Sequence, residues 1–156
     1  MANDSNPLIT CSHSGTTVTL IYQSPKAAGA IGKAQGEAWL NALDALQTLH
    51  FQTLRLELNS SGAHFGEPME GLAHLNAIAE KLWAFRRQDI HIQVQCPGWL
   101  YGGMAMILAS VAHEIILKPQ AQMGLFGSKL LKLSANSLIP DTKFNPTHLK
   151  LTRLSN

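Results

Sequence analysis

The fold of this chain is decided by the stretch LRLELNSSGA, residues 54–63. Its leucines alternate with Arg55 and Glu57, and this period of two predicts a strand with one buried face. The strand ends at NSSG, residues 59–62, because these residue types favour turns over continued pairing in a sheet. A half-buried strand that runs into a glycine-containing break is therefore the first element of the prediction.

A second stretch of the same kind, HIQVQCPGWLYGG, spans residues 91–103. Polar and apolar residues alternate up to Cys96, which predicts another strand, and Pro97-Gly98 ends it. Gly102-Gly103 then opens a helix of small residues that continues to about Ala112. The sequence thus predicts two strands that each run into a glycine-rich break.

The rest of the chain continues this alternation of strands and helices. We expect strands at 16–20, 54–58, 90–96, 114–118 and 122–126, and helices from 31 to about 49, 70–87 and 102–112. Such alternation predicts an α/β domain whose largely parallel sheet is covered by helices. Ligands of such sheets bind beyond the carboxyl ends of the strands, so the two glycine breaks are where we expect chemistry.

The two breaks suit the binding of an oxyanion. The first offers the backbone N–H of Ala63 after Gly62, and the second offers that of Gly103 after Gly102, at the start of a helix. Two such donors on one thioester oxygen would hold an enolate, and each would stabilise the transition state by about 3 kcal/mol. The alternative, that both glycines are ordinary strand-to-loop residues, is left open by the spacing alone.

Composition restricts the classes of protein that fit. A chain of 156 residues suits one domain, and 46% hydrophobic against 14% charged residues leaves apolar surface for another subunit. Cys11 and Cys96 form no metal or redox pattern and the histidines show no paired spacing, so we expect no disulfide framework and no metal site.

Charge and hydropathy further restrict the cellular location and the partners that fit the sequence. The longest apolar stretch, residues 102–112, is shorter than the ~20 residues of a membrane span, and residues 1–7 form no hydrophobic leader. A net charge of +2 is too small to indicate nucleic acid. We therefore expect a cytoplasmic protein with neither a membrane nor a nucleic acid as partner.

Three stretches resemble the crotonase superfamily, and within it the carboxyltransferase branch, which includes the β subunit of acetyl-CoA carboxylase and malonate decarboxylase subunits. The first is GAIGKAQGEAWL, residues 29–40, which is similar to a glycine-spaced helix entry. The second is SSGAHFGE, residues 60–67, which is similar to a Ser-Gly-Ala-Arg-Met-Gln-Glu loop. The third runs from Gly102-Gly103 through KPQA (118–121) to GLFG (124–127), and resembles a Gly-Gly helix, a Glu-Pro-x-Ala turn and a Gly-Phe-x-Gly strand.

The resemblance covers about residues 15–130 and implies a crotonase-like ββα spiral, a single compact α/β domain shortened at its C-terminus. It divides the chain into an N-terminal extension (1–14), a carboxyltransferase domain (15–127) and a basic tail (128–156). The tail is a candidate contact for coenzyme A phosphates or an acidic carrier protein, or else a solvated end.

The resemblance also implies roles for single residues. The catalytic positions are the amides of Ala63 and Gly103 together with Gly62 and Gly102, and no metal takes part. The substrate-binding candidates are His64, Trp99 and Tyr101.

Departures from the family shape the expected chemistry. His64 stands where the β subunits carry an arginine, and their chains continue well beyond the Gly-Phe-x-Gly strand into helices that complete the acyl-CoA site. In hydratases of the superfamily a glutamate three residues after the second oxyanion glycine acts as general acid and base, and Met106 stands there in this chain. Hydration would lack its proton shuttle, whereas decarboxylation or carboxyl transfer needs chiefly enolate stabilisation.

We therefore expect a subunit of an acyl-thioester carboxyltransferase or decarboxylase that acts on malonyl-CoA or a malonyl carrier protein. One alternative is a non-catalytic scaffold or regulatory homologue of a carboxyltransferase, and a third is an enoyl-CoA hydratase-like enzyme. We expect no covalently bound cofactor, with coenzyme A or phosphopantetheine as the thioester carrier and biotin as an option. The expected partners are further copies or a second carboxyltransferase-like subunit, and an acyl carrier or biotin carrier protein. The acyl chain, the carrier, the biotin dependence, the oligomeric state and activity of the chain alone are left open.

Overall fold

The computed structural model describes residues 7–24, 26–124 and 149–156. Its elements in chain order are β1 (Ile9–Ser14), β2 (Thr17–Tyr22), the 3₁₀ helix η1 (Lys26–Gly29), α1 (Lys33–Leu46), β3 (Thr53–Glu57), α2 (Pro68–Arg87), β4 (His91–Cys96), β5 (Trp99–Tyr101), α3 (Gly102–Val111), β6 (Glu114–Leu117), β7 (Gln122–Gly124) and β8 (Lys150–Arg153).

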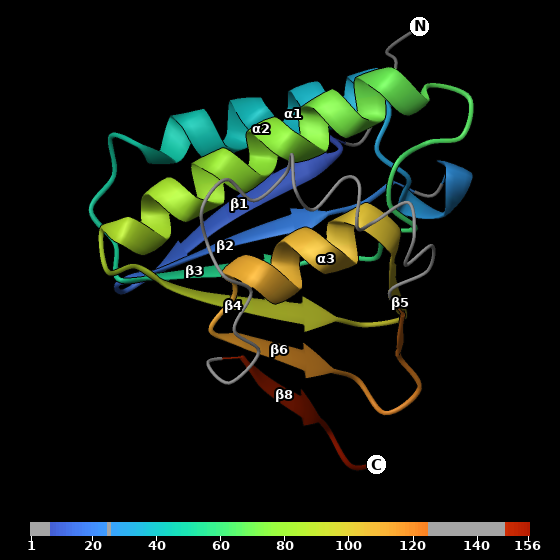
Figure 1. Cartoon of the computed structure of the whole chain (residues 1–156). Coiled ribbons are helices and arrows are strands. Elements are labelled where there is room, and N and C mark those ends of the chain that lie inside the picture. Colours follow the sequence, from blue (N-terminus) through green and yellow to red (C-terminus); the bar gives the residue numbers. More distant parts are fainter. Residues whose placement is uncertain (1–6, 25, 125–148) are drawn as a thin grey trace, which may run out of the picture.

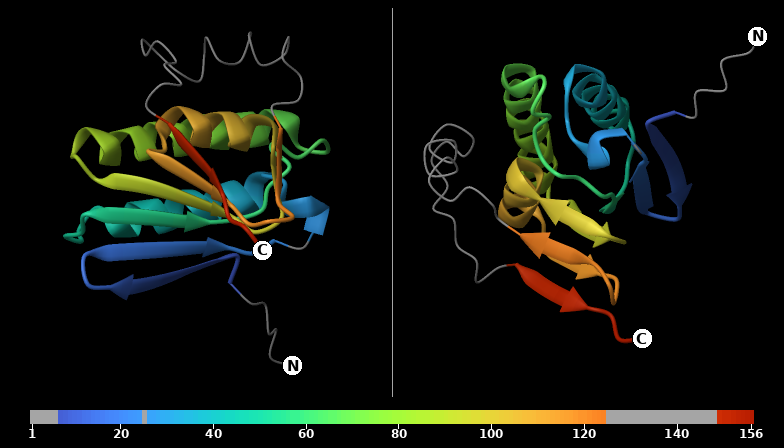
Figure 2. Two further views of the ribbon diagram at one scale, coloured as in Figure 1. Left: turned by 90° about the horizontal axis from the view of Figure 1, so that it is seen from below. Right: turned by 90° about the vertical axis from the view of Figure 1, so that its right-hand side faces the viewer.

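The main sheet of the described part has the strand order β1-β2-β3-β4-β6-β8. β1 pairs antiparallel with β2, and the later neighbours pair in parallel. α1, α2 and α3 lie together on one face of this sheet (Figures 1 and 2). A small parallel sheet of β5 and β7 stands across the carboxyl ends of the main strands (Figure 1). The predicted α/β architecture with a largely parallel sheet is confirmed.

The hydrophobic core fills the space between the sheet and the helices. Along β2, Val18, Leu20 and Tyr22 are buried while the residues between them are half-buried, and β3 and β4 alternate in the same way. Leu43 of α1 and Leu75 of α2 are fully buried in the same core. Each such aliphatic side chain stabilises the fold by roughly 1.5–3 kcal/mol when it leaves water.

The other face of the sheet carries a row of polar side chains that crosses adjacent strands. Arg55, Gln93, Glu114 and Lys150 are aligned partners in the strand registers. Arg55 Nε donates to Gln93 Oε1 at 2.8 Å, and Gln93 Nε2 donates to Glu114 Oε2 at 3.0 Å. Lys150 Nζ lies 3.2 Å from Glu114 Oε1. The hydrogen bond from Gln93, more than the nearby lysine, lowers the pKa of the Glu114 carboxyl. The expectation of helices over the sheet thus holds for one face in the described part of the chain.

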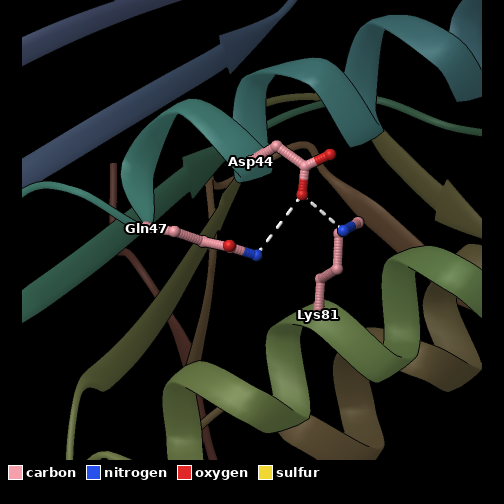
Figure 3. A network of polar contacts seen from close by, with 3 residues as sticks. All are labelled: Asp44, Gln47 and Lys81. Atoms are coloured by element: carbon pink, nitrogen blue, oxygen red, sulfur yellow. Dashed lines mark hydrogen bonds and ion pairs between the residues drawn. The ribbon is translucent and has the colours of Figure 1, made fainter.

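α1 and α2 pack side by side, and a glycine permits their close approach. A Cβ built on Gly36 of α1 would lie 2.2 Å from the His74 ring of α2, so a larger residue there would push the helices apart. Near the other end of α1, Asp44 accepts hydrogen bonds from Gln47 Nε2 and from Lys81 Nζ on α2 (Figure 3). Asp44 is about half exposed, so this ion pair contributes little to stability.

The structure differs from the sequence-based expectations at the ends of elements. α1 ends at Leu46, and Leu49, which was expected on its apolar stripe, is 41% exposed. The expected N-terminal extension contributes β1, and the expected basic tail contributes β8, both at edges of the sheet. Residues 128–148 of that tail, and residues 125–127 of the third motif, lie outside the described residues. No helix in the described part is long and apolar enough to cross a bilayer.

Candidate active site

The first glycine break leaves β3 and runs directly beside the second. Ser60 N–H donates to the Trp99 carbonyl at 3.1 Å, and Tyr101 N–H donates to the Ser60 carbonyl at 2.8 Å. These bonds form a short parallel bridge between Ser60 and Leu100 of β5. Two loops that are far apart in the sequence therefore form one unit at the carboxyl ends of β3 and β5.

On its other side the same loop pairs with the segment that leads into α1. Ile31 N–H donates to the Gly62 carbonyl at 2.8 Å, and His64 N–H donates to the Ile31 carbonyl at 2.9 Å. The Glu67 carboxylate reaches this segment as well, where its Oε2 accepts from Lys33 N–H at 3.1 Å. Lys33 is the first residue of α1, so Glu67 interacts favourably with the positive end of that helix.

These bonds leave the amides of Ala63 and Gly103 outside the backbone ladders. Ile31 bonds the residues before and after Ala63, so in this extended backbone the Ala63 N–H points to the opposite side. Gly103 is the second residue of α3, where an N–H has no partner within the helix. Neither amide donates to another residue within the described ranges. Both are therefore available to an external acceptor.

The two amides belong to backbones in close contact. Gly62 has φ +94, and a Cβ built on it would lie 3.0 Å from Gly103 N and 3.2 Å from Gly102 Cα. Gly102 has φ +64, and its Cβ would lie 3.0 Å from the Ser61 carbonyl oxygen. Glycine is required on both sides, because of the positive φ angles and because of the space. The residues expected to be catalytic lie together, and their catalytic role stays a prediction.

The start of α3 adds a positive electrostatic field at this point. Its first turn holds no acidic residue, and the N-cap residue Tyr101 makes no side-chain capping hydrogen bond. The free N–H groups and the helix dipole therefore favour an anion in front of Gly103. Within the described residues, no group of three or more metal-ligating side chains comes together.

The three expected substrate-binding residues have different environments. His64 Nδ1 accepts from Gly66 N–H at 3.0 Å, so neutral His64 carries its hydrogen on Nε2. Trp99 is 36% exposed and its Nε1 donates to the Ala28 carbonyl at 2.8 Å. Tyr101 is half-buried, and its hydroxyl donates to Gln122 Oε1 at 2.6 Å. His64 thus offers an N–H donor, whereas Trp99 and Tyr101 already hold neighbouring loops.

Met106 lies one turn after Gly103 in α3 and is half-buried. Its thioether carries no exchangeable proton, so this position cannot serve as a general acid or base. Glu67, the carboxylate of the first break, is bonded to the start of α1. The arrangement is therefore suited to stabilising negative charge through backbone donors, and the Met106 side chain offers no proton shuttle.

Sequence reasoning missed two residues of this unit, Asn59 and Ser60, which it treated as turn formers. Asn59 Oδ1 accepts from the N–H groups of Gly98 and Trp99 at 2.8 and 2.9 Å. Ser60 is fully buried, and its Oγ accepts from Gly62 N–H at 3.2 Å. Turn propensity explains these residue types equally well, so the sequence held no separate signal for the contacts.

Comparison with known proteins identifies the class of fold. No protein-family model matches the sequence, and no curated protein sequence matches it either. Solved structures do match, and they establish a crotonase-like α/β fold in a single compact domain, as the sequence predicted.

Three of the matching structures show the extent of the likeness. The Pseudomonas malonate decarboxylase MdcD-MdcE hetero-dimer matches with a TM-score of 0.68 at 16% identity, over 96% of this chain and 71% of that one. Enoyl-CoA hydratase from Bacillus halodurans matches with a TM-score of 0.64 at 14% identity, over 74% of this chain and 52% of that one. A methylmalonyl-CoA decarboxylase complexed with 2S-carboxypropyl-CoA matches with a TM-score of 0.65 at 15% identity, over 78% of this chain and 50% of that one. The chain thus spans about half the length of the hydratase and of the methylmalonyl-CoA decarboxylase.

Proposed function

We propose that this chain is a subunit of an acyl-thioester decarboxylase or carboxyltransferase that acts on a malonyl thioester. The observation that carries the proposal is the pair of unpartnered amides, Ala63 and Gly103, on backbones so close that a Cβ on Gly62 would lie 3.0 Å from Gly103 N, at the start of α3. Met106, at the position where superfamily hydratases carry a catalytic glutamate, favours this reaction over hydration.

The proposed reaction depends chiefly on backbone N–H donors and not on side chains. As the bond between the malonyl carboxylate and C2 breaks, CO₂ leaves and the electron pair moves onto the thioester oxygen as an enolate. The amides of Ala63 and Gly103 hold this oxygen, with about 3 kcal/mol from each donor. In decarboxylation C2 then takes a proton from water. In carboxyl transfer the released CO₂ forms a bond to a nitrogen of an acceptor such as biotin, and C2 takes the proton that this nitrogen loses.

The remaining roles follow the positions of the side chains. The Nε2–H of neutral His64 donates to the substrate carboxylate, in the place where carboxyltransferase β subunits carry an arginine. Trp99 and Tyr101 border the thioester on the β5 side. Coenzyme A or phosphopantetheine carries the acyl group, and the reaction takes place in the cytoplasm.

A second subunit is part of the proposal. The matching Pseudomonas malonate decarboxylase is a hetero-dimer, and the match covers 71% of its matched chain. Phe65 and Met69, beside the first break, are 100% and 74% exposed, and they offer apolar surface next to the site. We propose that a further copy or a second carboxyltransferase-like subunit completes the acyl-carrier site.

The test is decarboxylation of malonyl-CoA by the purified protein, alone and with any copurifying subunit. Gly103→Pro removes one N–H and is expected to lower the rate by about 100- to 1000-fold. Met106→Ala, the matched change one turn along α3, is expected to keep the rate and to cost about 1–2 kcal/mol of stability, because Met106 is half-buried. Circular dichroism must show that both variants fold.

Two results would contradict the proposal. A folded Gly103→Pro variant with full activity would remove the Gly103 amide from the mechanism. A complete wild-type assembly that has no thioester carboxyl chemistry, with or without biotin, would refute the enzyme and leave the non-catalytic scaffold as the explanation of the fold.

A further inference from the structure

Asn59, two residues after the end of β3, links the three loops that surround the candidate site. Its side-chain oxygen Oδ1 accepts from Gly98 N–H at 2.8 Å and from Trp99 N–H at 2.9 Å. Both partners are donors, so the amide group can have only one orientation, with its oxygen toward the turn between β4 and β5. One side chain from the first break therefore holds the turn that leads into the second.

The fit around Asn59 is tight on both sides. A Cβ built on Gly98 would lie 3.0 Å from Asn59 Oδ1, and a Cβ built on Gly29 would lie 2.2 Å from the Asn59 carbonyl oxygen. A side chain at Gly29 would therefore collide with the Asn59 backbone, and one at Gly98 would force a shift of a few tenths of an ångström.

Ser60 extends this link to the amides themselves. Its backbone pairs with Trp99 and Tyr101 on β5, and its buried hydroxyl oxygen accepts from Gly62 N–H at 3.2 Å. Gly62 immediately precedes Ala63. β5 ends at Tyr101, two residues before Gly103. Asn59 is thus connected to the Ala63 amide through Ser60 and Gly62, and to the Gly103 amide through Ser60, Tyr101 and Gly102.

We propose that Asn59 is a positioning residue that sets the separation of the Ala63 and Gly103 amides, and so tunes the oxyanion site. The inference rests on the proposed function for its kinetic part only. Serine or threonine is too short to span to both N–H groups of the turn, and leucine has no acceptor. Aspartate keeps the shape and both acceptor bonds, so Asn59→Asp is the conservative replacement.

The experiment compares Asn59→Leu, Asn59→Asp and Leu43→Ala in the full chain. Leu43 is fully buried in α1, so Leu43→Ala destabilises the fold at a place that makes none of these contacts. The first readout is the amide ¹⁵N–¹H spectrum with hydrogen exchange, without any ligand. The second is the steady-state decarboxylation of malonyl-CoA, with kcat and KM measured separately.

In Asn59→Leu we expect faster exchange at Gly98 and Trp99 and shifted amide signals at Ala63 and Gly103, while Asn59→Asp keeps the wild-type signals. We expect kcat of Asn59→Leu to fall by about 10- to 100-fold with KM within about threefold, because misplaced donors weaken only the transition state. Leu43→Ala should keep kcat and the four signals.

The inference is overturned if the Ala63 and Gly103 signals of Asn59→Leu stay unshifted, or if Leu43→Ala shifts them equally. It is also overturned if Asn59→Leu keeps kcat. A wild-type protein without decarboxylase activity would remove the proposed function, and the amide signals alone would then decide whether Asn59 positions the two loops. Should Asn59→Leu not fold, the proposal stands or falls on Asn59→Asp, which must keep the wild-type signals.

Discussion

Substitution of Gly62 by alanine tests the contact on which the candidate site depends. Gly62 has φ +94, beyond the left-handed region near φ +57 that alanine tolerates at some cost. A Cβ at this position would also lie 3.0 Å from Gly103 N, so the neighbouring backbone must move by a few tenths of an ångström. The substitution therefore strains one break and displaces the amide of the other.

A matched control comes from Gly15, in the turn between β1 and β2. Gly15 also has a positive φ, +58, but a Cβ there would meet nothing within 4 Å. Gly15→Ala should lose about 1 kcal/mol, because the left-handed strain of 1–2 kcal/mol is partly offset by the lower entropy of the unfolded chain. Gly62→Ala should lose about 2–4 kcal/mol, since the strain is greater and the steric contact adds to it.

Urea unfolding of both variants measures the loss of stability, and the rate of malonyl-CoA decarboxylation measures the effect on the candidate site. We expect Gly62→Ala to be about 10- to 100-fold slower than wild type and Gly15→Ala to keep its rate. Equal losses of stability in the two variants would refute the close approach of the breaks. A folded Gly62→Ala variant with full activity would refute the use of the Gly103 amide.

Three further predictions concern stability and pH. Burial raises the pKa of the Tyr22 phenol to about 12, so the folded chain keeps a proton that the unfolded chain releases above pH 10. The free energy of unfolding should therefore fall by up to about 2 kcal/mol between pH 10 and 12. In Tyr22→Phe most of this fall should be absent, and urea unfolding at several pH values measures the difference. Burial, aided by nearby cationic side chains, lowers the pKa of His113, whose Nδ1 accepts from Ile92 N–H at 3.0 Å. The unfolded chain then binds more protons, so the free energy of unfolding should fall as pH drops below about 6.5. In His113→Asn the free energy of unfolding, measured in urea, should change less between pH 7.5 and 5.5. Asp44→Asn removes the ion pair with Lys81 and should change the free energy of unfolding by less than about 1 kcal/mol in urea.

Each of these predictions has a result that would contradict it. An alkaline loss of stability equal in Tyr22→Phe and wild type would show that another group titrates. A loss of stability at acid pH that persists in His113→Asn would show that a group other than His113 titrates. A loss above about 2 kcal/mol in Asp44→Asn would mean that the Asp44–Lys81 ion pair of Figure 3 contributes more to stability than a surface ion pair does.

The central elements could be predicted from the sequence because burial on one face gives them a period of two. Leu54, Leu56 and Ile92 are all fully buried, and their alternation with polar residues placed β3 and β4 within a residue or two. The glycine breaks were predictable for a similar reason, since positive φ and close approach restrict the residue type.

The edges of the sheet could not be predicted in this way. Five of the six residues of β1 are exposed, so its sequence ITCSHS carries no alternation between apolar and polar residues. β5 is three residues long, and its pairing partners, β7 and Ser60, lie in other parts of the chain. Pairing partners of this kind leave no local pattern, and for the same reason the contacts of Asn59 became visible only in three dimensions.

The polar row across the open face of the sheet has a consequence for the alignment of the strands. Gln93 meets Arg55 on one side and Glu114 on the other only when β3, β4 and β6 pair in the observed register. A slip of β4 by one residue would bring Ile92 or Val94 to the water-facing side and bury polar side chains beneath the helices. It would also carry the turn after β4 about 3.3 Å along the sheet, several times the displacement that oxyanion donors tolerate. The polar row therefore favours the one register of β3, β4 and β6 that brings the two glycine breaks together at the carboxyl ends of the strands.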